Sequence, residues 1–191
     1  GLLLGFSAVR ASAQADAPPA DVRVTVQTSE GAIVVALDRA HAPITSANFL
    51  RYVDQKRLDG VTIYRALRFG ENGGLIQGGA RGNPKRGLPP IAPAPTTKTG
   101  LSHVAGTISM ARFAPGTATA DFFILASDIP ALDANPAQAG DNAGFAAFGH
   151  VVEGMDVVQR IVTLPTSPTA GEGALKGQML VAPVKVVSVR R

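Results

Sequence analysis

Apolar and polar residues alternate with a period of two near both ends of the chain. Residues 22–26 and 33–37 show this alternation on either side of a Thr-Ser-Glu-Gly turn at 28–31, and residues 184–189 show it again. Successive side chains of a strand point to opposite faces, so the pattern predicts half-buried strands, and the first two runs predict a β-hairpin. An antiparallel sheet is therefore expected to open the domain.

Two segments carry apolar residues at helical spacing instead. The first starts at Pro43, a residue suited to the first turn of a helix, and is predicted to run to the Asp-Gly pair at 59–60. The second covers residues 155–162, with three apolar side chains facing inward. One helix is thus expected early in the chain and one late.

Short β-type runs occupy much of the sequence between these helices. Residues 61–64, 107–110 and 122–125 are such runs, separated by stretches rich in glycine and proline. Many short strands with only two helices indicate a β-barrel or sandwich with helical caps rather than a parallel α/β sheet. The irregular stretch 81–98 contains five prolines, and a loop of that length in a compact domain is typically functional or flexible.

Composition narrows the classes of function. The 191 residues suit one domain, and 18 Lys and Arg against 14 Asp and Glu are spread along the chain. With two Tyr and no Trp, a nucleic-acid stacking surface is not expected. The chain has no cysteine, so disulfides and thiolate chemistry are excluded. His41, His103 and His150 lie far apart without carboxylates at ligand spacing, so we predict structural histidines and no metal site.

The first residues suggest export. Residues 2–6 form a short apolar run, followed by small residues at 11–15 of the kind that precede signal-peptide cleavage. We predict that residues 1–20 are a residual signal peptide and tether, that 21–191 form the domain, and that the protein is periplasmic. The run is too short to span a bilayer. The alternative is an ordinary disordered terminus of an intracellular protein.

The motifs of common hydrolases are missing, since neither a Gly-x-Ser-x-Gly elbow nor a His-Glu-x-x-His pair is present. A different set of motifs follows in order along the chain: Ile63-Tyr64-Arg65, Ile76-Gln77-Gly78-Gly79, Gly106-Thr107-Ile108-Ser109-Met110-Ala111-Arg112, Asp121-Phe122-Phe123-Ile124 and Phe148-Gly149-His150-Val151. In their order and spacing these motifs resemble the cyclophilin family, and the resemblance covers residues 21–191.

The resemblance implies a mainly β fold, an eight-stranded antiparallel closed barrel capped by two helices. It implies peptidyl-prolyl cis-trans isomerase activity on proline-containing peptides and folding proteins, without a cofactor, in a protein that we expect to be monomeric. Arg65 matches the catalytic arginine of the family and Gln77 the glutamine beside it. The walls of the proline pocket match Met110, Phe123 and Leu132, and Arg112 matches a position whose backbone pairs with the peptide.

The role of an arginine in this reaction has a simple physical basis. Peptide resonance imposes a barrier of about 18–20 kcal/mol on rotation of the Xaa-Pro bond. At the twisted transition state the prolyl nitrogen loses conjugation and can accept a hydrogen bond. A permanently charged guanidinium such as that of Arg65 can donate there without proton transfer.

The sequence departs from the family at three positions in or near the substrate-binding set. Asp121 stands where Gln is usual, Gly74 where an aromatic wall is common, and Phe145 where His or Tyr is often found. A carboxylate only accepts hydrogen bonds, so a bond donated to the peptide would be lost, and Asp121 is expected to pair with Arg65 or Arg112. The longer stretch 133–142 is expected to reshape the pocket rim.

These departures leave a second class of function open. A cyclophilin-fold peptide-binding or chaperone module with little isomerase activity would also fit Asp121 and Gly74, whereas the retention of Arg65 and Gln77 favours an enzyme. A third class, a carrier of apolar ligands inside the barrel, is disfavoured because small eight-stranded barrels are commonly filled by side chains.

Overall fold

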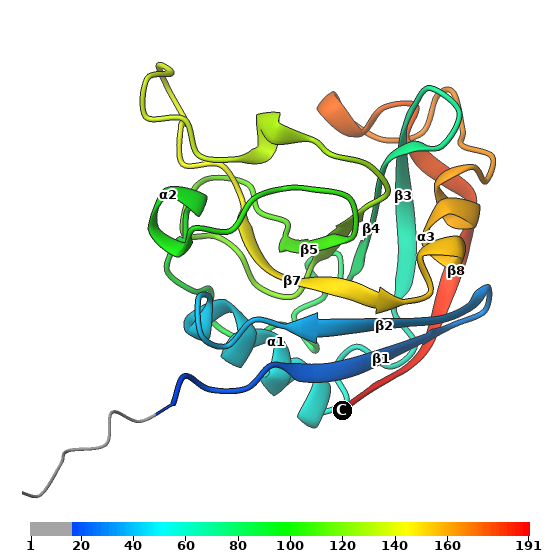
Figure 1. Ribbon diagram of the computed structural model, residues 1–191. Coiled ribbons are helices and arrows are strands. Elements are labelled where there is room, and N and C mark those ends of the chain that lie inside the picture. The colour runs from blue at the N-terminus through cyan, green and yellow to red at the C-terminus, as the bar shows by residue number, and fades with distance from the viewer. Residues whose placement is uncertain (1–16) are drawn as a thin grey trace, which may run out of the picture.

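Eight antiparallel strands close into a barrel in the computed structural model, which describes residues 17–191 (Figure 1). In order around the barrel the strands are β1 (Val22–Thr28), β2 (Gly31–Leu37), β7 (Ala146–Glu153), β5 (Thr107–Met110), β6 (Phe122–Leu125), β4 (Gly73–Gly79), β3 (Thr62–Phe69) and β8 (Met179–Arg190), which pairs with β1. The predicted barrel is therefore confirmed and the sandwich alternative is wrong.

The predicted hairpin at the start of the domain is β1 and β2. Val24 lies opposite Val35 and Val26 opposite Ile33, and all four side chains are fully buried. The predicted signal peptide and the first residue of the tether fall outside the described residues, and the first strand begins at Val22. The alternation in the sequence thus gave the correct inward face.

In the part of the chain that the structure describes, three helices accompany the barrel. They are α1 (Pro43–Asp54), the single-turn α2 (Thr96–Thr99) and α3 (Met155–Val162), with 3-10 turns at Pro130–Leu132 and Gly173–Leu175. The late helix is confirmed, whereas the early helix ends at Asp54 rather than near Gly60. The chain turns at Lys56, which has a φ of 55°, because Leu58 is fully buried in the core and the Gly60 amide donates to Val186 of β8.

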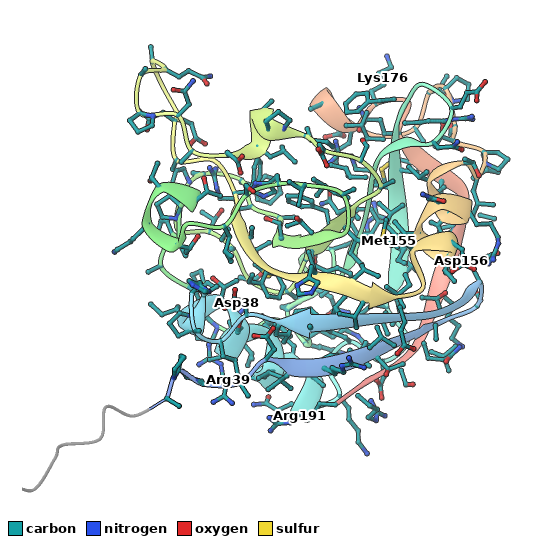
Figure 2. All side chains as sticks on the ribbon, viewed as in Figure 1. Asp38, Arg39, Met155, Asp156, Lys176 and Arg191 are labelled. Atoms are coloured by element: carbon teal, nitrogen blue, oxygen red, sulfur yellow. The ribbon has the colours of Figure 1, made fainter. Side chains whose placement is uncertain are left out.

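Side chains from all parts of the chain form one core inside the barrel. Phe49 of α1 packs edge-on against Phe122 of β6, with ring centroids 5.7 Å apart. At the start of α3, Met155 packs against this core while Asp156 points outward (Figure 2). Because these side chains fill the interior, the structure argues against an apolar ligand inside the barrel, the function that the sequence already disfavoured.

A second apolar cluster lies apart from this core. It consists of Leu75, Phe123 and Leu125, with Leu67, Ala111, Ile129, Leu132 and Phe145 packed against them. Within residues 17–191, no helix has both the length and the apolar character needed to cross a membrane. Phe123 of this second cluster lies opposite Gln77 of β4.

Candidate functional site

A β-bulge in β3 places Arg65 on the outer face of the barrel. Ile63 lies opposite Gly78 of β4 and Arg65 opposite Gln77, so Tyr64 is an extra residue without a partner on that strand. Strict alternation would give Ile63 and Arg65 the same face, and Ile63 is fully buried in the core. The bulge shifts this phase by one residue, which is how bulges redirect side chains beside active sites.

Arg65 belongs to a row of outward-facing residues that crosses four strands. Arg65 of β3 lies opposite Gln77 of β4, Gln77 opposite Phe123 of β6, and Phe123 opposite Ser109 of β5. Residues that are directly opposite share a face of the sheet. The sheet therefore brings a charged donor, an amide and an aromatic ring together from segments far apart in the sequence.

Two glutamines hold the guanidinium of Arg65. Its Nε donates to Oε1 of Gln178 and its Nη1 donates to Oε1 of Gln77, both at 2.7 Å. Burial lowers the pKa of Arg65, although a guanidinium remains charged at any physiological pH. Within residues 17–191, Nη2 makes no hydrogen bond, so this nitrogen is available to a ligand.

Gln77 continues into a chain of hydrogen bonds that ends at Asp121. Gln77 Nε2 donates to the Tyr64 hydroxyl at 2.9 Å, and this hydroxyl donates to Oδ2 of Asp121 at 2.5 Å. The other carboxylate oxygen accepts the Arg81 amide at 3.0 Å. Burial and then the charge of Asp121 raise the pKa of Tyr64, so its hydroxyl keeps its proton. The expected ion pair of Asp121 with Arg65 or Arg112 is wrong, because both carboxylate oxygens are taken by other donors.

Gly79, the second glycine of the Gln-Gly-Gly motif, makes room for Asp121. Its φ is 142°, and a Cβ atom at this position would lie 2.4 Å from Oδ1 of Asp121. Any side chain here would displace the carboxylate. Gly74 is equally restricted: its φ is 120°, and a Cβ would lie 1.8 Å from the Leu67 carbonyl oxygen. The hairpin backbone therefore has no place for the aromatic wall that the family often has at this position.

The apolar part of the site is formed by Phe123, Leu132 and Phe145, as the sequence indicated. The rings of Phe123 and Phe145 meet edge to face with centroids 5.5 Å apart, and the Phe145 amide donates to the Leu132 carbonyl at 2.9 Å. Met110 does not join them. It lies opposite Phe122 on β5 and is buried in the barrel core.

Leu75 supplies the apolar side chain that sequence reasoning assigned to Met110. It packs in the same outer cluster as Phe123. The signal for Leu75 was its position two residues before Gln77 on one strand, which gives both side chains the same face. Met110 was misassigned because β5 turns its even-numbered residues, Ile108 and Met110, toward the interior.

Arg112 holds the loop at 133–144 beside this cluster. Its guanidinium forms a bidentate pair with Asp141 at 2.7 and 3.1 Å, donates to the Gly144 carbonyl, and lies 4.8 Å from the centroid of the Phe145 ring. These bonds lower the pKa of Asp141. Within residues 17–191 the backbone amide and carbonyl of Arg112 make no hydrogen bond, so both are open to an extended peptide.

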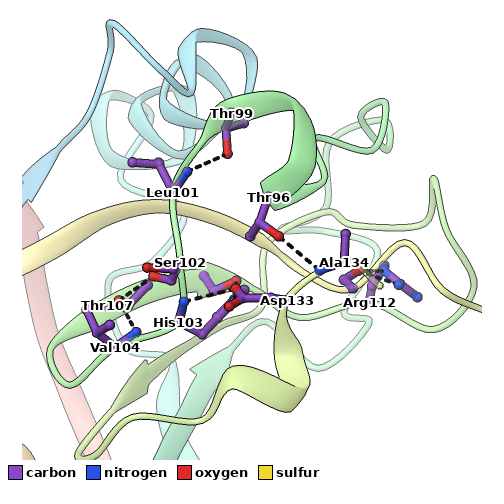
Figure 3. A network of polar contacts seen from close by, with 12 residues as sticks. Thr96, Thr99, Leu101, Ser102, His103, Val104, Thr107, Arg112, Asp133 and Ala134 are labelled. Atoms are coloured by element: carbon purple, nitrogen blue, oxygen red, sulfur yellow. Dashed lines mark hydrogen bonds and ion pairs between the residues drawn. The ribbon is translucent and has the colours of Figure 1, made fainter. Parts of the chain in front are cut away.

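A polar network joins His103 to Asp133 (Figure 3), and the His103 ring is in contact with Phe123. His103 Nδ1 lies 2.6 Å from Oδ1 of Asp133, and its Nε2 lies 2.9 Å from the Ser109 hydroxyl. This order of Ser, His and Asp resembles a nucleophilic triad, but Ser109 and His103 are fully buried, so the hydroxyl cannot reach a substrate. The His103 ring stacks on Phe123 at 6.0 Å. The network thus supports the apolar pocket, and His103 is the structural histidine that was predicted.

The arrangement can hold a peptide and direct a fixed positive donor at it. The guanidinium of Arg65 on β3 and the ring of Phe123 on β6 lie on the same face of the sheet, with Gln77 of β4 between them. Among residues 17–191 no group of three or more His, Asp or Glu side chains is placed to bind a metal. A reaction that needs only electrostatic stabilisation suits these groups.

The chain is similar to known proteins over nearly its whole length. Residues 23–190 match the family described as cyclophilin type peptidyl-prolyl cis-trans isomerase/CLD. A peptidyl-prolyl cis-trans isomerase of Acinetobacter baylyi is 34% identical over 174 residues, covering 90% of this chain and 86% of the relative. Peptidyl-prolyl cis-trans isomerase B of Escherichia coli is 34% identical over 152 residues, covering 75% and 85%.

Solved structures agree on the fold. A cyclophilin-type peptidyl-prolyl cis-trans isomerase of Cryptosporidium parvum, crystallised in the presence of the dipeptide Ala-Pro, superposes with a TM-score of 0.70 at 18% identity. The match covers 88% of this chain and 98% of that one.

Proposed function

The chain belongs to the cyclophilin-type peptidyl-prolyl cis-trans isomerases, and from this premise we propose that Arg65 catalyses rotation of Xaa-Pro bonds by donating a hydrogen bond to the prolyl nitrogen. The observation that carries the proposal is the guanidinium itself. Gln77 and Gln178 fix it through Nη1 and Nε, while Nη2 is left without a partner in the described chain.

The donor lowers the barrier only if it binds the twisted state better than the planar ones. In a planar amide the nitrogen lone pair is delocalised and accepts poorly. When the bond twists, the lone pair localises on nitrogen and becomes an acceptor for a charged N–H. Because the guanidinium is already oriented, it does not need to reorganise at the moment of rotation, which is where preorganised donors gain their effect.

The apolar cluster holds the proline ring during this rotation. Leu132 and Phe145 are half-buried and offer a surface, with the buried side chains of Phe123 and Leu75 packed against them, and burial of a small ring against this surface anchors one side of the bond. The open backbone groups of Arg112 suit pairing with the chain that precedes the proline. One half of the peptide is then fixed while the other half turns.

A protease-free assay of cis-to-trans relaxation in Ala-Pro and Leu-Pro peptides tests the proposal. Removal of an oriented donor typically costs about a hundredfold or more in rate, so Arg65→Ala should lose about that factor of kcat/KM. Arg23→Ala is the matched control, because Arg23 is an exposed arginine paired with Glu153 on the far strands. If Arg65→Ala keeps the wild-type rate, another group drives the rotation.

A peptide-binding module is the second candidate, and Asp121 is the observation that favours it. Both carboxylate oxygens accept bonds from within the protein, so the side chain has no donor to offer a bound peptide. Calorimetric binding of proline peptides without acceleration of their isomerisation would support this candidate over the enzyme.

Export is proposed on the N-terminal residues alone. The apolar run at 2–6 and the small residues at 11–15 suit processing by a signal peptidase, which would place the domain in the periplasm. Fractionation of the native host with mass spectrometry of the N-terminus tests this. An unprocessed chain in the cytoplasm would overturn it.

A further inference from the structure

The hydrogen bonds that run from Arg65 to Asp121 all point in one direction. Arg65 Nη1 donates to Gln77, Gln77 Nε2 donates to Tyr64, and the Tyr64 hydroxyl donates to Asp121, at 2.7, 2.9 and 2.5 Å. The chain begins at a group that can only donate and ends at a group that can only accept. This direction fixes the role of each group between them.

From this order we infer that Tyr64 and Asp121 are positioning residues for Arg65, an inference that rests on the proposed function. An amide that accepts from Arg65 must turn its NH₂ the other way, toward the Tyr64 hydroxyl. That hydroxyl then accepts from Gln77 and must send its own proton elsewhere, to Asp121. The carboxylate therefore locks the orientation of the Gln77 amide through Tyr64, and the amide locks one edge of the guanidinium.

The second contact of Asp121 explains why a carboxylate stands here. Oδ1 accepts the Arg81 amide at 3.0 Å while Oδ2 accepts the Tyr64 hydroxyl. An amide side chain has one accepting oxygen and a donating NH₂, so Asn or Gln would face one of these two donors with a donor of its own. The change from the usual Gln to Asp121 thus belongs with Tyr64 and is not a defect of the site.

The series of hydrogen bonds from Arg65 to Asp121 is shielded from competing water. Tyr64 and Gly79 are buried, Asp121 and Gln77 are half-buried, and the Arg81 guanidinium covers the Tyr64 ring at 4.7 Å from its centroid. Hydrogen bonds in such surroundings polarise one another more than they do in water. Removal of the Tyr64 hydroxyl, the last donor in the series, is therefore expected to weaken the hydrogen bond that Arg65 donates to Gln77.

The test compares the two tyrosines of the chain. Tyr64→Phe removes only the hydroxyl, and Tyr52→Phe is the matched control, because Tyr52 is buried and its hydroxyl accepts the Leu88 amide outside the site. We expect Tyr64→Phe to lower kcat about tenfold, the equivalent of about one hydrogen bond, with KM within about twofold. Tyr52→Phe should lower the thermal midpoint but leave kcat unchanged.

A background lacking Gln77 separates positioning from a general loss of stability. In Gln77→Ala the hydrogen bonds that link Tyr64 to Arg65 are already lost, so adding Tyr64→Phe should change kcat by less than about twofold. Asp121→Asn, which keeps the shape of the side chain, should also lower kcat, and it serves if Tyr64→Phe folds poorly. Wild-type kcat in Tyr64→Phe, or an equal loss with and without Gln77, would overturn the inference.

A nuclear magnetic resonance readout keeps this inference distinct from the proposed function. The Nη1–H signal of Arg65, the group that donates to Gln77, is assigned by its loss in Arg65→Lys and should exchange faster with solvent in Tyr64→Phe than in wild type or Tyr52→Phe. An inactive wild-type protein in which this signal still responds to Tyr64→Phe would refute the proposed function alone. An unchanged signal would refute the positioning role even in an active enzyme.

Discussion

Gln178 offers a sharp test of the proposed role of the Arg65 guanidinium and of how it is held. It lies 113 residues from Arg65 in the sequence, and its Oε1 accepts from Arg65 Nε at 2.7 Å. The backbone of Gln178 is fixed as well, because its carbonyl accepts the Ala66 amide at 2.9 Å. Gln178→Ala would leave Arg65 with a single side-chain anchor, Gln77.

The size of the effect follows from the type of bond. A hydrogen bond to a charged group is worth about 1.5–3 kcal/mol, and the half-buried Arg65 side chain can recover part of this from water. A net loss near 1.4 kcal/mol in the transition state corresponds to about a tenfold lower kcat. KM should change little, because the apolar cluster that we propose to hold proline does not include Gln178.

Gln55 provides the matched control for this prediction. Its Oε1 accepts from Arg57 Nε at 2.6 Å, the same pair of atoms in an exposed setting away from the site. Relaxation of Ala-Pro peptides, measured at several peptide concentrations, should show reduced kcat for Gln178→Ala and wild-type values for Gln55→Ala. If the two variants behave alike, Gln77 alone suffices to orient Arg65.

Two further predictions concern the polar groups around the pocket. Burial lowers the pKa of His103 against the opposing effect of Asp133, so the unfolded chain binds more protons than the folded one, and the free energy of unfolding should fall as pH drops below about 6.5. Denaturant titrations at several pH values should show a smaller decrease of the free energy of unfolding in His103→Gln, and the wild-type decrease in His41→Gln. The same dependence on pH in the wild type and both variants would contradict the prediction. Asp141→Asn should weaken the clamp by Arg112 and speed amide hydrogen exchange in residues 133–144 while α1 is unaffected, and an unchanged loop would show that the bonds to Gly144 suffice.

Local sequence patterns predicted most of the barrel correctly. The hairpin, the strands at 107–110 and 122–125 and the late helix follow from periods of two and 3.6, because these periods reflect which side of one element is buried. The same patterns could not end α1 at Asp54, since its end depends on the burial of Leu58 against distant strands. The one-turn helix α2 is too short to carry a period.

Some residues of the candidate site could be predicted from the sequence and others only from the structure. The motifs singled out Arg65, Gln77 and Phe123 as residues of the site, and their chemistry could be argued from side-chain type alone. Met110 was assigned the place that Leu75 occupies because both side chains are apolar, and the sequence alone does not show which of them faces the barrel interior. Only the paired strands decide which of the two faces outward.

Sequence by itself determined the kinds of groups available: a permanent cation, an amide, apolar rings, and no cysteine. The tertiary structure decided where they point. The bulge at Tyr64 turns Arg65 outward against the alternation of its strand, and the closing strand brings Gln178 to its Nε. Asp121 becomes the end of a hydrogen-bond chain only because β4 and β6 are neighbours. These contacts join residues far apart in the chain, and no local period encodes such pairings.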